Sequence, residues 1–281
     1  MKASALVLTV LLISAVELGC GSEPIPDCVI GRGGWIAKYT LVPGQSVSGA
    51  CVNDFAPPYS AAAVNPVTGG RGHRQGEALG IQKYGFNIPN PTVGIYTNTF
   101  AEVAPNGLAN PPTVPVPPSV ALGTFQAARP DSSNLCTATG FSLGSLDGTP
   151  NGSIRYQWNA LQWYVTTRHN GTQLAGTMGY TSGGCTANYT VFALFPEIPC
   201  NVDADCAANP APGQLFGSGI NPDYPVFCDT SLPDPDETYC NCPTPDCLDG
   251  TGNPICPNAI SNLGFAGTCF FRDISRFPSL R

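Results

Sequence analysis

The chain contains few charged residues and almost no histidine. Asp, Glu, Lys and Arg make up 11% of its 281 residues, well under the usual quarter, and only two histidines occur. The formal net charge of −7, without a basic cluster, argues against nucleic acid as a partner, since phosphate binding requires clustered Lys and Arg. His73 and His169 stand apart in the sequence, so a zinc site built on neighbouring histidines is not expected.

Apolar runs long enough to span a bilayer are also missing. The first apolar stretch, Ala3 to Val16, follows the positive charge of Lys2. As a helix it would cover about 21 Å, against about 30 Å of hydrocarbon. We therefore interpret residues 1–19 as a signal peptide that is removed on export.

The end of this stretch carries a cysteine in a distinctive setting. Leu18-Gly19-Cys20 resembles a bacterial lipobox, in which the cysteine is acylated and becomes the first residue of the mature chain. The pattern departs from the family at Glu17, where leucine is preferred. The resemblance implies a lipid anchor on Cys20. The alternative is an ordinary secretory signal cut near Gly21 or Ser22, which would make the protein secreted.

Cysteine parity bears on this choice. Thirteen cysteines leave one unpaired, and an exported chain seldom keeps a free thiol. Setting Cys20 aside, by lipidation or by cleavage, leaves twelve cysteines for six disulfides. In the lipoprotein interpretation, residues 20–27 form the anchor and a short tether before the fold.

The composition predicts a folded, loop-rich, all-β protein. Hydrophobic residues reach 42%, enough for a core, and the chain has 32 glycines and 29 prolines. Strand-length apolar runs recur without a sustained helical period, which indicates an antiparallel β-sandwich over residues 28–199. The expected strands are Trp35–Val42, Gly80–Ile88, Val93–Val103, Ser119–Ala127, Cys136–Leu143, Ile154–His169, Thr172–Tyr180 and Cys185–Phe195.

A hairpin is expected around Asn170-Gly171, because this pair favours a type I′ turn. A two-residue loop there would pair Val165 with Gly176 and Trp163 with Met178. It would also place the large apolar side chains of both strands on one face, with a bulge near Asn159 to Leu161. The opposite face is expected to be wet and to form a binding patch, whose residues are Gln162, Tyr164, Thr166, Arg168 and Gln173.

The composition changes after residue 199. Residues 200–269 hold eight of the thirteen cysteines and nine acidic residues, with no Lys or Arg. We expect residues 200–281 to be a small, loop-dominated region held by disulfides. Its "DADC" and "CNC" steps resemble the tails of exported lipoproteins in myxobacteria, a resemblance of composition that carries no known activity.

Both halves of the mature chain contain an even number of cysteines, which predicts two separately bridged units. We expect Cys28 to pair with Cys51 and Cys136 with Cys185. The pairing of the remaining cysteines stays open, and these are Cys200, Cys206, Cys228, Cys240, Cys242, Cys247, Cys256 and Cys269.

One pattern suggests a hydrolase. "GFSLG" fits the G-x-S-x-G nucleophile elbow around Ser142, and Asp147 and His169 follow in the order of a triad. The elbow requires a helix after the serine. "LGSLDGTPNGS" is a poor helix, so an exported hydrolase is the alternative and not the main hypothesis.

A second pattern suggests calcium. Asn201, Asp203 and Asp205 alternate as in the start of a calcium loop, but Cys206 stands where glycine is needed and Pro212 where the bidentate glutamate belongs. A calcium-stabilised adhesion protein is the alternative that these residues allow. No other cofactor is expected.

The hypothesis that fits the whole sequence is a non-catalytic lipoprotein of the cell envelope. The membrane would be contacted through the lipid, and the sandwich would offer a surface for binding or assembly, with glycans or other envelope proteins as partners. The expected location is extracytoplasmic, at the outer membrane or in the periplasm.

Overall fold

A computed structural model describes residues 26–45, 51, 78–84, 89–97, 118–149, 152–209, 217–232 and 267–279. Within these ranges, nine strands form one antiparallel sheet. They are β1 (Gly33–Leu41), β2 (Ala78–Tyr84), β3 (Thr92–Thr97), β4 (Ala121–Phe125), β5 (Leu135–Thr139), β6 (Gly144–Thr149), β7 (Gly152–Val165), β8 (Asn170–Ser182) and β9 (Cys185–Leu194).

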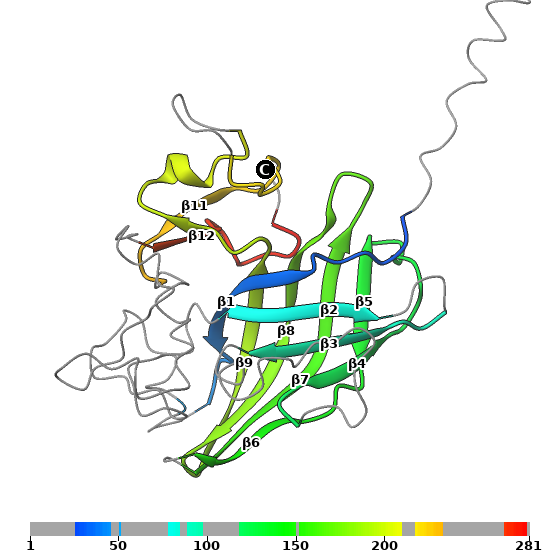
Figure 1. Cartoon of the computed structure of the whole chain (residues 1–281), viewed down its shortest axis with the longest axis vertical. Helices are drawn as coiled ribbons and strands as arrows, with labels where there is room; N and C mark the ends of the chain where they lie inside the picture. The colour runs from blue at the N-terminus through cyan, green and yellow to red at the C-terminus, as the bar shows by residue number, and fades with distance from the viewer. Residues whose placement is uncertain are drawn as a thin grey trace, which may run out of the picture.

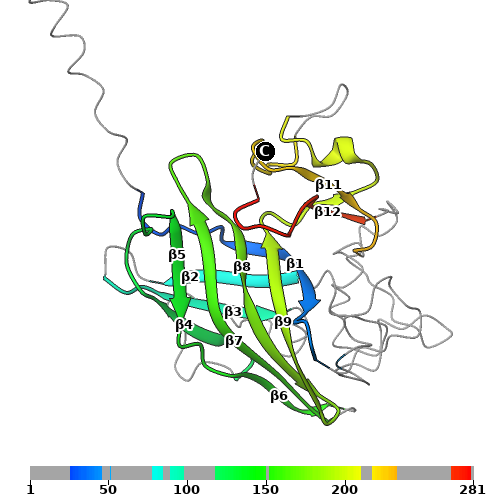
Figure 2. The same cartoon turned by 180° about the vertical axis from the view of Figure 1, so that it is seen from behind.

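The sheet folds into two facing layers that are joined at both edges. Strands β1 to β3 run across β7, β8 and β9, as Figures 1 and 2 show from opposite sides. β1 pairs with β9 at one edge, and β5 pairs with both β4 and β7 at the other. The all-β antiparallel class expected from the sequence is confirmed, and hydrogen bonds continue around the whole sheet.

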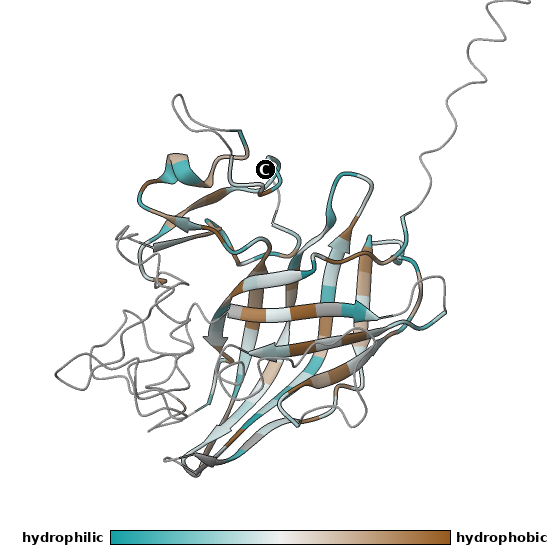
Figure 3. Ribbon diagram, viewed as in Figure 1, coloured by the Kyte–Doolittle hydropathy of each residue, from teal (hydrophilic) through white to brown (hydrophobic). Residues whose placement is uncertain are grey.

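All eight expected strands are present, and β4, β5 and β7 end earlier than expected, whereas residues 85–88 and 98–103 of two expected strands lie outside the described residues. β6 was missed, because "GSLDGT" is rich in residues that strands disfavour. Hydrophobic and hydrophilic residues alternate along the strands (Figure 3), as expected for strands with one face toward the core.

The space between the layers is filled by aromatic and branched side chains. The largest fully buried ones include Trp35, Trp158, Trp163, Tyr156 and Tyr180. Phe125 of β4 lies 5.3 Å from Trp163 of β7, centroid to centroid, and so joins the two layers. Aromatic burial of this kind dominates the energetics of a core.

The β7–β8 hairpin differs from the expectation in its turn and register. The chain reverses between Thr166 and His169, whose backbone groups exchange hydrogen bonds of 2.8 and 3.2 Å. Trp163 consequently pairs with Leu174 and Val165 with Asn170. The predicted turn at Asn170-Gly171 is therefore wrong, whereas the core face and the bulge between Trp158 and Leu161 are confirmed.

Gly171 explains the shift. It has a φ of 59° and lies in a bulge of β8, where its carbonyl accepts a 3.0 Å hydrogen bond from the N–H of Gly31. A side chain there would collide with the carbonyl oxygen of Val29. The glycine thus allows the N-terminal segment to approach β8 closely, and the turn preference of Asn-Gly does not reveal this role.

The disulfides correct the predicted pairing in the first half. Cys28 bonds to Cys136, and Cys51 bonds to Cys185. The N-terminal segment lies beside the loop before β5, where the N–H of Cys28 donates to Ala128 at 2.7 Å, so spatial and not sequence neighbours pair.

In the second half, Cys200 bonds to Cys228 and Cys206 to Cys269. None of these four bridges links the two halves of the chain, as the two-unit prediction required. Cys20, Cys240, Cys242, Cys247 and Cys256 lie outside the described residues.

Candidate functional site

A small second sheet packs on the outside of the large one. It consists of β10 (Pro199–Cys200), β12 (Gly267–Phe271) and β11 (Val226–Asp229), beside a short 3-10 helix, η2 (Asp203–Cys206). We refer to residues 199–209, 217–232 and 267–279 as the C-terminal module. It lies at the upper end of β1, β8 and β9 in Figure 1.

The sequence of β9 determines where the module docks. Up to Val191 the strand alternates polar and apolar residues, but Phe192, Ala193 and Leu194 form a continuous apolar run. Phe192 and Leu194 point away from the main core and are buried in a second core with Ile36 and module residues such as Phe270. A strand segment covered on both faces requires such a run.

A buried ion pair also holds the module. Lys38 on the outer side of β1 lies 2.8 Å from the carboxylate of Asp229, whose side chain is 7% exposed. Burial by itself raises the pKa of Asp229, but hydrogen bonds from Lys38 and Ser231 outweigh it and hold this pKa below its ordinary value. The carboxylate therefore stays charged at neutral pH and keeps its partner.

The tip of the β7–β8 hairpin contacts the module through His169. Its Nε2 lies 3.2 Å from Asp223 and its Nδ1 2.9 Å from the hydroxyl of Thr166. Its ring stacks on Tyr224 at a centroid distance of 5.6 Å. The hydroxyl of Thr166 also accepts the N–H groups of Arg168 and His169, so its lone pairs are engaged in closing the turn. The arrangement positions the imidazole against the module.

The pKa of His169 is lowered mainly by burial, while Asp223 raises it and Arg168 lowers it further. The ionisable groups around the ring also include Tyr164 and Tyr224. Because the unfolded chain binds this proton more readily, the stability due to His169 is full above its ordinary pKa of 6.5 and falls as the pH drops through it.

We therefore expect wild-type protein to lose more stability than His169→Gln when the pH falls from about 8 to about 5. Urea unfolding at both pH values measures the free energy of unfolding. Comparing the two proteins cancels the contribution that carboxylate titration makes to both. Equal losses in the two proteins would contradict the assignment.

The predicted binding patch does not form one open surface. Gln173 is fully buried, because its amide exchanges hydrogen bonds of 3.2 and 2.9 Å with the backbone of Ser279. Tyr164 is half-buried against His169, and Gln162 is half-buried. Arg168 is exposed at the tip, where its carbonyl accepts a hydrogen bond from Asn221. The C-terminal module covers this part of the face, which the sequence alone did not indicate.

The open part of the same face lies further from the hairpin tip. Thr40, Thr190 and Thr177 form one row across β1, β9 and β8. The next rows hold Asn188 and Gln157, then Thr186 and Thr181, whose hydroxyls are 3.0 Å apart. We call these residues, with Asn159, the threonine face, and its members are Thr40, Gln157, Asn159, Thr177, Thr181, Thr186, Asn188 and Thr190.

The threonine face is uncharged and regular. Its hydroxyl and amide groups repeat at the spacing of the strands, about 4.8 Å across the sheet. Arg155, at its margin, is paired with Asp147. A signal for this face does exist in "TMGYTSGGCTANYT", where Thr and Asn alternate with large core residues. The alternation shows which residues face away from the core, but not which part of that face the C-terminal module leaves uncovered.

Comparison with known proteins places the large sheet in a family. The MlpA family matches residues 33–196, from the first residue of β1 to just beyond β9. This chain belongs to the MlpA family. A Myxococcus xanthus protein described as "Putative lipoprotein MlpA" is 28% identical over 171 residues, which are 58% of this chain and 69% of that protein. No solved structure matches.

The match has a structural meaning. The unit shared with the MlpA family is the nine-stranded sheet, and the C-terminal module follows it in the chain. The resemblance to myxobacterial lipoproteins inferred from the sequence is confirmed by this relative. Among the described residues, no helix has the length and hydrophobicity needed to cross a bilayer.

The three residues of the hydrolase pattern are not assembled in this MlpA-family sheet. The hydroxyl of Ser142 accepts the N–H of Leu122, and Asp147 pairs with Arg155. Ser142 lies near Gln157 of β7, because the carbonyl of the neighbouring Phe141 accepts a hydrogen bond from Gln157. Thr166, at the hairpin tip that carries His169, is nine residues further along the chain. At about 3.3 Å per residue, Ser142 and His169 are therefore on the order of 30 Å apart. The elbow interpretation of Ser142 is therefore wrong.

The acidic residues proposed for calcium already have protein partners. Asp203 accepts the N–H of Cys228 and pairs with Arg272 at 2.8 Å, and these contacts lower its pKa. A carboxylate oxygen of Asp205 accepts the N–H groups of Asn201 and Val202 at 2.7 and 3.0 Å. Both carboxylates thus contribute to the fold of η2 and its neighbours, and calcium binding here stays a prediction.

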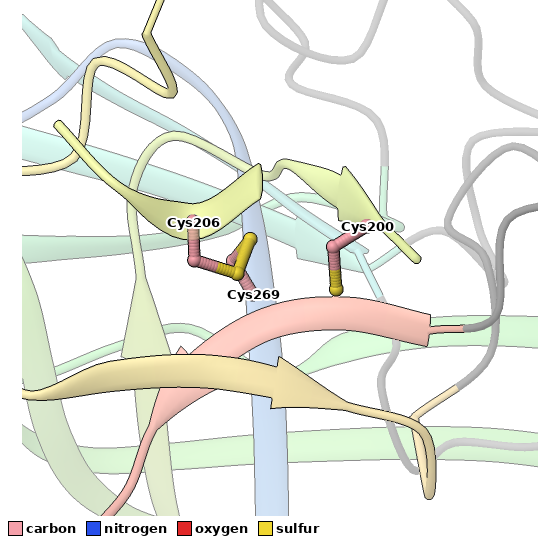
Figure 4. Close-up of side chains that lie close together, drawn as sticks. All are labelled: Cys200, Cys206 and Cys269. Atoms are coloured by element: carbon pink, nitrogen blue, oxygen red, sulfur yellow. A yellow bond between two sulfur atoms is a disulfide. The ribbon is translucent and has the colours of Figure 1, made fainter. Parts of the chain in front are cut away.

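One cluster of potential metal ligands occurs among the described residues. The sulfurs of Cys200, Cys206 and Cys269 lie within 4.8 Å of one another in the buried centre of the module (Figure 4). All three belong to disulfides, since Cys200 bonds to Cys228 and Cys206 to Cys269. A metal binds the thiolate form of cysteine. The cluster is therefore the covalent core of the module.

Proposed function

We propose that this chain is a non-catalytic lipoprotein of the cell envelope, anchored through Cys20, whose sheet presents the threonine face to a polar partner. The observation that carries the proposal is the MlpA-family sheet, which follows a Leu18-Gly19-Cys20 step. The named relative is described as a lipoprotein, which supports the same chemistry here. The separation of Ser142 from His169 supports a binding role over a hydrolase.

An uncharged glycan is the partner that fits the threonine face. The face offers donors and acceptors in repeating rows, which suit a polymer with a repeating pattern of hydroxyls. The chain carries a formal net charge of −7, so an acidic polysaccharide would be repelled. The twisted sheet beneath these rows is held by a packed aromatic core, which keeps the array rigid.

The anchor is tested at Cys20. Wild-type protein expressed in a bacterial host should incorporate labelled palmitate and partition with membranes, whereas Cys20→Ser should do neither, because serine has no thiol to acylate. Glu17→Leu restores the leucine preferred in the lipobox and is the matched control, expected to remain lipidated. A mature chain that begins at Gly21 or later without lipid would overturn the anchor.

The binding surface is tested by alanine substitution. Thr177→Ala with Thr190→Ala should weaken binding of a neutral polysaccharide by about tenfold, the loss expected for two hydrogen bonds at roughly 0.5–1.5 kcal/mol each. Binding can be measured by affinity electrophoresis over a panel of neutral and acidic polysaccharides. Thr124→Ala, at an exposed threonine of β4, is the control and should have no effect. Binding of acidic polysaccharides alone, or an equal effect of the control, would contradict the assignment.

A further inference from the structure

The first described residues of the chain are fixed at one end of the large sheet. Cys28 is bonded to Cys136 at the start of β5, and its N–H donates to Ala128. Its carbonyl accepts a 2.6 Å hydrogen bond from Lys83, and Gly31 donates to Gly171. A covalent bond and backbone hydrogen bonds thus determine where the N-terminal segment leaves the fold.

Two neighbouring loops form this end of the molecule. Loop 126–134 precedes β5 and the hairpin tip 166–169 follows β7. They are linked by a 2.8 Å hydrogen bond from Val165 to Asn134. Arg129 in the loop lies 3.5 Å from Asp27. We call these two loops, with residues 26–28, the proximal end.

The chain between the anchor and the proximal end is short compared with the sheet. Seven residue steps separate Cys20 from Asp27, a maximal reach of about 25 Å. β8 runs twelve residue steps away from the hairpin tip, from Asn170 to Ser182, which is about 40 Å at 3.3 Å per residue. An anchor of this reach brings the proximal end to the membrane and leaves the far end of β8 remote from it.

We propose that the proximal end rests on the lipid surface and that the β8–β9 end of the threonine face points away from the membrane. The inference rests on the lipid anchor of the proposed function and adds the orientation of the protein on the bilayer. The hairpin tip contacts the C-terminal module through Arg168 and Asn221, so the adjoining edge of the module lies at the membrane side. The threonine face then remains accessible to a partner outside the membrane.

The chemistry of the proximal end fits contact with headgroups. Exposed Arg129 lies beside Asp27, and Arg168 and Asp131 are exposed as well, so charges of both signs are present. Among the described residues, the exposed large hydrophobic side chain nearest in sequence to residues 26–28 is Val29, at 36% exposure, which is too little to insert into hydrocarbon. The orientation is therefore imposed by the tether, and it should be the same on zwitterionic and on anionic vesicles.

Energy transfer to labelled lipids tests the orientation. The lipidated full-length protein is reconstituted into phosphatidylcholine vesicles with an acceptor on the headgroups. A donor is placed through an azidophenylalanine at Ser133, in the proximal end, or at Thr186, near the β8–β9 turn; both positions are exposed. Transfer should be clearly stronger from Ser133. Equal or reversed transfer would overturn the orientation while leaving the anchor intact.

A longer tether is the matched control. Inserting about 20 Gly-Ser residues between Ser22 and Glu23 adds a maximal reach of roughly 70 Å, which should remove most of the difference between the two donor positions. A difference that survives the insertion would show that the surface itself binds lipid and would overturn orientation by the tether. Failure of the protein to sediment with vesicles would overturn the anchor, and the orientation with it.

Discussion

Replacing Cys28 and Cys136 together with serine is expected to lower the free energy of unfolding by about 4 to 5 kcal/mol. The bond joins residues 108 apart in the sequence, so it removes a large amount of conformational freedom from the unfolded chain. It also fixes the N-terminal segment against β5 and β8. For a domain of this size the loss corresponds to a fall of about 10–20 °C in Tm.

A second disulfide provides the comparison. Cys200 and Cys228 are 28 residues apart, so replacing both with serine is expected to cost about 3.5 kcal/mol by the same relation. Calorimetry of the two double variants under non-reducing conditions measures both values. If the Cys28–Cys136 variant is as stable as wild type, the bridge does not form in the native protein, and the fixed exit point of the N-terminal segment is lost with it.

The strands could be predicted because the sheet has one dry and one wet face over most of its length. In β9, Asn188 and Thr190 alternate with Tyr189 and Val191, and the burial of these residues follows the same alternation. The same alternation in β7 placed Trp163 and Val165 correctly on the core side and located the bulge before Leu161. The local sequence pattern was sufficient to predict the structure wherever a side chain faces either solvent or the main core of the large sheet.

The remaining features depend on contacts between distant segments. Gly171 resembles a turn residue, but the native role of this glycine is to let Val29 approach β8. Gln173 is a polar residue of the kind found on solvent-exposed surfaces, but Ser279, 106 residues later, covers it. The partner of Cys28 is set by the fold of β5, since nothing near Cys28 distinguishes Cys51 from Cys136. The candidate site lies on the threonine face and not at the hairpin tip for the same reason, because contacts between distant segments determine where the C-terminal module docks.

Phe192→Ala should destabilise the docked C-terminal module by about 3 kcal/mol, the cost typical of removing a buried aromatic side chain. Phe192 is 9% exposed and lies 6.0 Å from Phe277 in an edge-to-face arrangement. Its neighbours across the sheet are Lys38 and Ala175, which belong to the covered part of the face. Hydrogen exchange at Cys269 and Phe270 of β12 reports the loss of docking directly.

Thr190→Ala is the matched control, because Thr190 points to the same side of β9 just two residues earlier. Its neighbours across the sheet are Thr40 and Thr177, and this row belongs to the open threonine face. A surface substitution of this kind should change stability by no more than about 0.5 kcal/mol. Comparing the two variants therefore locates the boundary between the covered part and the open part of one continuous sheet face. Equal effects at the two positions would mean that the module does not end between them, and the threonine face would then not be free to bind a partner.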